Sequence, residues 1–104
     1  NRPVAVEAET GKTRTELEKE KRREKLNRQA LRQLKTRAQE AEKAVGSKEA
    51  EIAKLEAQMA DPALYSDAQK AADVQRVYQK AQQELQTLYE QWEAAEAALS
   101  QEDD

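Results

Sequence analysis

The feature that most constrains the fold is a heptad repeat in the second half of the chain. Its positions alternate at spacings of three and four, and all are apolar or aromatic: Ala71, Val74, Tyr78, Ala81, Leu85, Leu88, Trp92, Ala95 and Leu99. The residues between them are mostly Gln, Glu, Lys and Ala. Such a repeat is typical of a helix that buries one narrow stripe against another helix. The stretch therefore predicts a coiled-coil helix that needs a partner.

A matching repeat precedes it and supplies the partner. Its positions are Leu31, Leu34, Ala38, Ala41, Val45, Lys48, Ile52, Leu55 and Met59. Lys48 is the exception in this apolar series, and we expect its aliphatic stem to follow the seam while its ammonium group reaches water. Upstream of Leu31 the same frame meets Glu and Asn, so we expect the helix to project beyond its partner there. Gly46-Ser47 is compatible with a break capped by Ser47, but we favour an unbroken helix with a weak point.

A short turn between the two seams predicts an antiparallel arrangement. Pro62 disfavours helix at Asp61, and a six-residue connection forces two long helices to run in opposite directions. We expect an all-α fold of two long antiparallel helices that form an intramolecular coiled-coil hairpin, with a flexible N-terminal tether. The expected bounds are a disordered linker over 1–14, a hairpin over 15–100 and a frayed tail over 101–104. Within the hairpin we expect a helix over about 15–60, a turn over 61–66 and a helix over 67–100.

Local signals refine the helix ends and the pairing. Thr13 with Glu16, or Thr15 with Glu18, fits a capping box at the first helix, and Ser66 with Gln69 fits one at the second. Folding the chain about residue 63 places Ile52 opposite Val74 and Tyr78. Trp92 is the largest seam residue, and we expect Trp92→Ala to be the most damaging single substitution, at about 3–5 kcal/mol.

Composition excludes several classes of protein. The chain has 104 residues, of which 38% are charged and 4% aromatic, with no Cys and no His. It cannot form a disulfide framework, and it lacks the usual soft metal ligands. No apolar run approaches the roughly 20 residues of a bilayer span. The paired carboxylates Glu49/Glu51 and Asp103/Asp104 lie on an expected solvated surface, without a pocket that could shift a pKa. We therefore expect a cytoplasmic, monomeric domain without catalysis, metal or cofactor, and with no membrane contact.

The charge is unevenly distributed along the chain. Residues 1–38 carry twelve Lys/Arg and six Glu, whereas residues 39–104 carry six Lys/Arg and fifteen Asp/Glu. The candidate nucleic-acid-binding residues are Lys19, Lys21, Arg22, Arg23, Lys25, Arg28, Arg32 and Lys35, and the neighbouring Arg37 continues the run. Four of these residues share one helix face, because their spacings are four, three and four: Lys21, Lys25, Arg28 and Arg32. A basic face of this kind suits phosphates along a nucleic-acid backbone.

The simpler alternative is a solvated helix end, partly neutralised by Glu16, Glu18, Glu20 and Glu24. Stacking on bases requires exposed aromatic side chains. Tyr65 at the turn is the only plausible candidate, and packing is the better explanation for it. If the basic face does bind nucleic acid, we expect weak, structure-directed and salt-sensitive binding.

Several short motifs suggest a family. They are Leu55-Glu56, the turn Asp61-Pro62-Ala63-Leu64-Tyr65-Ser66-Asp67, Glu84-Leu85, and Leu88-Tyr89-Glu90-Gln91-Trp92-Glu93. Over about residues 25–99 the chain resembles the C-terminal coiled-coil domain of ABC-F ATPases of the Uup type. The resemblance implies two upstream ATP-binding cassettes joined by a linker, which would bind ATP outside this fragment. It also implies a non-catalytic appendage that contacts DNA or ribosomal RNA.

Two other functions remain open from the sequence. A structural coiled coil could mediate protein–protein contact or self-association, which exposed Leu17 and Leu26 would allow. A tRNA-guiding arm like that of seryl-tRNA synthetase finds no support in the upstream linker. The residues do not distinguish DNA from RNA or the ribosome as the target.

Overall fold

The computed structural model describes residues 11–103, and these residues are all-α. Helix α2 (Arg14–Ala60) is followed by the short 3₁₀ helix η1 (Pro62–Ser66) and by helix α3 (Ala68–Asp103). The chain divides into two compact units between Gln33 and Leu34, and each is described separately below. The all-α class is confirmed. The predicted linker over 1–14 falls mostly outside the described residues.

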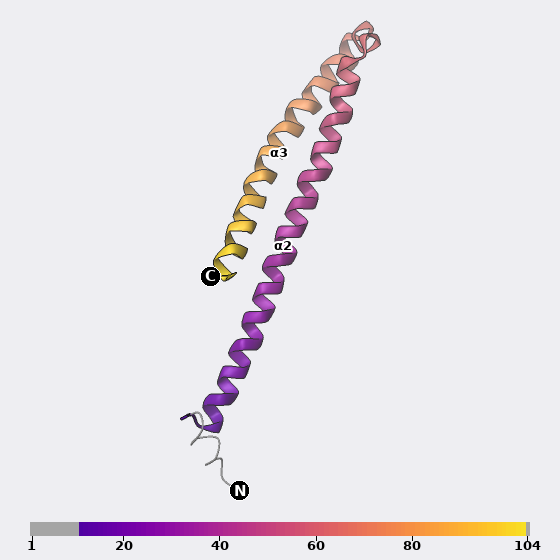
Figure 1. Ribbon diagram of the computed structural model, residues 1–104. Helices are drawn as coiled ribbons and strands as arrows, with labels where there is room; N and C mark the ends of the chain where they lie inside the picture. The colour runs from indigo at the N-terminus through magenta and orange to yellow at the C-terminus, as the bar shows by residue number, and fades with distance from the viewer. Residues whose placement is uncertain (1–10, 104) are drawn as a thin grey trace. The chain divides into compact units, whose positions relative to one another are not determined.

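The second unit is a coiled-coil hairpin. From the η1 turn, α3 runs back alongside the part of α2 that follows Leu34 (Figure 1). Every predicted seam position in 34–59 and 71–99 is buried or half-buried. Ile52, Leu55 and Ala81 form the central cluster, against which Val74, Tyr78 and Leu85 pack. Ala81 is only 2% exposed, because its small side chain faces two large ones. The two heptad seams are thus the core of this unit.

Trp92 is less enclosed than its size suggested. It is half-buried, and its indole Nε1 donates a hydrogen bond to Glu96 Oε1 at 3.3 Å. A seam between two helices is too narrow to cover both faces of an indole ring. The largest expected loss of stability therefore moves from Trp92 to the aliphatic cluster around Ile52.

Ile52, Val74 and Tyr78, which folding about residue 63 places opposite one another, lie in one cluster. Three polar contacts cross between the helices: Lys48 Nζ to Glu84 Oε2 at 3.4 Å, Tyr78 OH to Glu56 Oε2 at 3.3 Å, and Tyr89 OH to Glu49 Oε2 at 2.6 Å. In each case the α3 residue lies further along the chain than folding about residue 63 predicts. Long Lys, Glu and Tyr side chains at the edge of the seam thus reach partners that are offset along the neighbouring helix.

Hydrogen bonds fix the turn. Asp61 Oδ1 accepts from Ala63 N at 2.9 Å, and the Tyr65 hydroxyl donates to Met59 O at 2.7 Å. The cap of α3 is Asp67, whose Oδ1 accepts from Lys70 N at 3.1 Å. The predicted Ser66–Gln69 capping box is wrong, because the Ser66 hydroxyl donates to Ala63 O within the turn instead.

Helix α3 also ends later than predicted. It continues to Asp103, so residues 101–103 of the predicted frayed tail are helical. Neither Gly nor Pro interrupts Ser100-Gln101-Glu102, and Gln and Glu are good helix formers.

Gly46 is the weak point inside α2, and the helix passes through it unbroken, as expected. A Cβ atom added at Gly46 would meet no atom within 4 Å. We expect Gly46→Ala to raise the free energy of unfolding by about 1 kcal/mol, because alanine loses less backbone entropy in a helix. Urea unfolding followed by circular dichroism would measure the gain. Gly11→Ala is the control: Gly11 has φ +70°, which strains alanine, so that variant should gain nothing.

Lys48 is the polar exception in the seam, and its long side chain is largely covered, as expected for a stem that follows the seam. Its side chain is 20% exposed, and Nζ lies 2.7 Å from Glu51 Oε2 as well as 3.4 Å from Glu84 Oε2. The hydrogen bond to Glu51 and the charges of both glutamates raise the pKa of Lys48. The ammonium group thus links α2 to α3 at the edge of the core.

Stability of the hairpin should fall in alkaline solution. The hydrogen bond to Glu49 raises the pKa of Tyr89, and desolvation followed by the charge of Glu56 raises the pKa of Tyr78. Together with Lys48, all three groups hold their protons more tightly when folded. Their contribution to the free energy of unfolding is complete at a pH below their pKa values in the unfolded state. It is lost as the pH rises through their pKa values in the folded state, above about pH 10. Urea midpoints at pH 9 and pH 11 would test this, and Glu49→Gln should reduce the difference. An equal midpoint at both pH values would contradict it.

Candidate nucleic-acid interface

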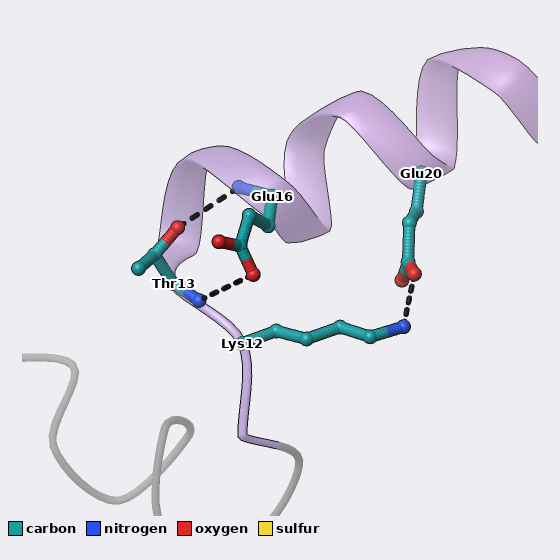
Figure 2. A network of polar contacts seen from close by, with 4 residues as sticks. All are labelled: Lys12, Thr13, Glu16 and Glu20. Carbon is teal, nitrogen blue, oxygen red and sulfur yellow. Dashed lines mark hydrogen bonds and ion pairs between the residues drawn. The ribbon is translucent and has the colours of Figure 1, made fainter.

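A capping box begins the helix that carries the candidate residues. Thr13 Oγ1 accepts from Glu16 N at 3.2 Å, and Thr13 N donates to Glu16 Oε2 at 3.3 Å (Figure 2). Lys12 reaches over this first turn to pair with Glu20. Of the two predicted boxes the Thr13–Glu16 box is formed, and α2 accordingly begins at Arg14. These contacts satisfy orphan donors of the first turn, so the basic stretch starts from a defined helix end.

The structure places all eight predicted site residues on α2, and all eight are exposed. Seven of them, from Lys19 to Arg32, belong to the first unit, and Lys35 belongs to the second. Every residue from Lys21 to Ala30 is exposed, which is nearly three helical turns with no covered side. A polar helix that is open on all sides offers its cations freely to a ligand.

Three of the four glutamates near this stretch make contacts with residues other than the eight candidates. Glu16 bonds to Thr13 N, Glu18 Oε1 lies 3.6 Å from Arg14 Nε, and Glu20 pairs with Lys12. Over residues 11–103, no ion pair joins any of the eight candidate residues to a carboxylate. Whether these cations contact phosphate groups stays a prediction.

Arg14 is a basic residue that the sequence reasoning left out. It is the first residue of α2 and is exposed. It lies seven residues before Lys21, and positions seven apart share a helix face. The sequence analysis places Arg14 in the linker. The spacing of seven residues between Arg14 and Lys21 is the signal by which Arg14 joins the candidate nucleic-acid-binding residues.

Aromatic side chains add little to this surface. Tyr78 and Trp92 are half-buried in the seam of the second unit. Tyr65 is 58% exposed, and its hydroxyl donates a hydrogen bond to Met59 O in the last turn of α2. Because more than half of Tyr65 is exposed, the packing role that we preferred for it stays a prediction.

The carboxylate pairs have structural roles where they are described. Glu49 accepts from Tyr89, and Glu51 pairs with Lys48. Residues 11–103 contain no cluster of three or more potential metal ligands, and none of their helices is both long and apolar enough to cross a membrane. Asp104 lies outside the described residues, and nothing is inferred for the Asp103/Asp104 pair.

Comparison with known families agrees with the hairpin and its motifs. Residues 25–97 match the ABC transporter C-terminal domain family. The chain belongs to this family. Lys25, Arg28, Arg32 and Lys35 lie within the matched region, whereas the candidates from Lys19 to Arg23 precede it. Searches of curated proteins and of solved structures found no match.

Membership in this family fits the expected separation between this domain and the domain that hydrolyses ATP. A C-terminal domain of an ABC protein is distinct from the domain that hydrolyses ATP. The hairpin turn and the Trp92-Glu93 motif both fall inside the matched region. Most of the matched region is therefore the part of the chain that forms the coiled coil.

Proposed function

We propose that this ABC transporter C-terminal domain binds nucleic acid through the basic face of α2. The observation that carries the proposal is the exposed, unpaired set of cations from Lys19 to Lys35. Phosphate neutralisation by Lys and Arg dominates the affinity of proteins for nucleic acids. The described part of the first unit, residues 11–33, carries nine Lys/Arg and four Glu.

The second unit makes a poor alternative surface for phosphates. Residues 34–103 carry eight Lys/Arg against fourteen Asp/Glu. Phosphate groups would be repelled by this surplus of carboxylates. The charge distribution therefore supports phosphate binding by the first unit and a scaffold role for the hairpin.

The wider setting follows from the resemblance to ABC-F ATPases of the Uup type. In this proposal the chain is a non-catalytic appendage of a cytoplasmic ATPase whose upstream cassettes bind ATP. Its partners would be DNA or ribosomal RNA, together with the ATPase domains of the same chain. The appendage itself would act as a monomer and need no cofactor.

Charge reversal tests the proposal. We expect Arg22→Glu, Arg23→Glu and Arg28→Glu together to weaken binding to duplex or structured nucleic acid at least 100-fold, because three cations of the interface become anions that repel phosphate groups. The control reverses three exposed lysines of the second unit, Lys43, Lys54 and Lys80, and carries the same net charge. Fluorescence anisotropy at low salt measures both.

The control distinguishes a local contact from a net-charge effect. Equal weakening by both triple variants would contradict a site on the first unit. Absence of binding by the parent chain, combined with a concentration-dependent dimer in sedimentation, would instead favour the structural coiled coil. The exposed side chain of Leu26 would be a natural contact in that case.

A further inference from the structure

Six basic residues of the first unit lie on two opposite sides of α2, and Arg22 lies between these sides. At about 100° per residue, one stripe of four cations spans an arc of about 60°. We name it the Lys21 stripe; it consists of Lys21, Lys25, Arg28 and Arg32. A second group, the Lys19 pair, consists of Lys19 and Arg23, which lie about 160–200° around the helix from Lys21. Two opposite flanks of the same helix segment are therefore positively charged.

The two sides between these flanks differ in character. Arg22, Leu26 and Gln29 occupy one of them, at about 80–140° from Lys21. Leu26 is 64% exposed, and Arg22 and Gln29 are exposed as well. We name this side the Arg22 side. It combines hydrogen-bonding groups with one apolar side chain.

The opposite side is acidic. Glu20 and Glu24 lie at about 260–300° from Lys21, so both face away from the Arg22 side. The half-buried residues of the described helix in this unit, Leu17, Glu20 and Leu31, also lie on the acidic side. The flanks and the Arg22 side are consequently the parts of the segment that suit an anionic ligand, because the carboxylates of Glu20 and Glu24 repel phosphate groups.

This arrangement matches the shape and charge of one nucleic-acid groove. A helix with its side chains is about 10–12 Å across, and the major groove of B-form DNA is about 12 Å wide with a phosphate backbone on each side. A helix in that groove needs cations on both flanks, donors and apolar groups toward the bases, and acidic groups toward solvent. The major groove of A-form RNA is too narrow and deep to admit it.

We propose that residues 19–32 of α2 lie in the major groove of duplex DNA. The Lys21 stripe contacts one phosphate backbone, the Lys19 pair contacts the other, and Arg22, Leu26 and Gln29 face the base edges. This inference rests on the proposed nucleic-acid binding and narrows it to a duplex DNA ligand and a binding geometry. Because the helix is capped and formed before contact, docking does not require the segment to fold first.

Two matched double variants test the geometry. Lys21→Ala with Lys25→Ala removes two cations four residues apart on one flank, and Lys19→Ala with Arg23→Ala removes two with the same spacing on the other. Alanine is the best helix former, so circular dichroism should show unchanged helix content. For each variant, anisotropy titrations of a labelled 20-base-pair DNA duplex over a range of salt give the slope of log K against log salt.

Groove docking predicts that both flanks contribute. Each double variant should make the salt slope less negative by about 1.8, the value for two lost phosphate contacts on B-DNA. If one pair shifts the slope and the other leaves it unchanged, the helix contacts DNA from a single side and groove docking is wrong, while nucleic-acid binding stands. If the parent chain binds neither DNA nor RNA duplex, the proposed function itself fails.

A second probe addresses the groove directly. DNA in which the cytosines carry glucosylated hydroxymethyl groups has a blocked major groove and an unchanged phosphate backbone. We expect its affinity, and that of an RNA duplex of the same sequence, to be at least tenfold lower than that of unmodified DNA. Equal affinity for the blocked and the unmodified DNA would overturn groove docking.

Discussion

Replacing Ile52 by alanine is expected to lower the free energy of unfolding of the hairpin by about 2–4 kcal/mol. The loss has two parts, the transfer of the removed methyl and methylene groups and the cavity that they leave. Ile52 is buried in the central cluster, where it packs with Leu55 and Ala81. The second unit is a two-helix structure, so a loss of this size is a large share of the stability that a small domain has. Urea unfolding followed by circular dichroism would measure it.

A matched control is available on the surface of the same hairpin. Val77 is 48% exposed on α3, so Val77→Ala also shortens a β-branched side chain to alanine but leaves the core intact. We expect that variant to change stability by no more than about 0.5 kcal/mol. An Ile52→Ala protein as stable as the Val77→Ala protein would remove the Ile52 cluster from the core.

Salt is expected to have the largest effect on binding. If six or more of the eight candidate cations contact phosphates, affinity for a DNA duplex should fall about 1,000-fold or more between 50 and 200 mM salt. The physical reason is that each phosphate contact releases a condensed counterion, and this release is worth less as bulk salt rises. Anisotropy titrations at four salt concentrations would define the slope.

The charge-reversed protein provides the reference for this measurement. With Arg22, Arg23 and Arg28 changed to Glu, any residual binding should show a shallower dependence on salt. An affinity of the parent chain that did not change between 50 and 200 mM would contradict an electrostatic interface on α2 and favour a contact through apolar side chains such as Leu26.

Local interactions explain which predictions from sequence succeeded. The heptad positions from Leu34 to Met59 and from Ala71 to Leu99 are buried or half-buried because the 3.5-residue repeat is itself the stripe that one helix presents to another. The Thr13–Glu16 box was predictable because its partners are three residues apart, although the same spacing also allowed the Thr15–Glu18 box. The turn formed because Pro62 excludes helix at Asp61.

Competition between alternative contacts explains which predictions failed. Ser66 and Asp67 can both cap a helix. In the folded turn the Ser66 hydroxyl donates to Ala63 O, so Asp67 is the residue that caps α3. Trp92 fits the repeat as well as Ile52 does, yet only the packing shows that a two-helix seam leaves its ring half-buried. The basic residues could be identified by type and spacing, but whether Glu16, Glu18 and Glu20 neutralise them depended on the contacts of the first turn.

The sequence by itself determined that the chain is helical, that two apolar stripes must meet and that the positive charge gathers near the start of α2, because periodicity, proline placement and charge are properties of the chain alone. Only the tertiary structure decided which side chains bond across the two helices. The contacts of Lys48 with Glu84 and of Tyr89 with Glu49 join separate elements, and such a contact has no signature in the spacing of either one.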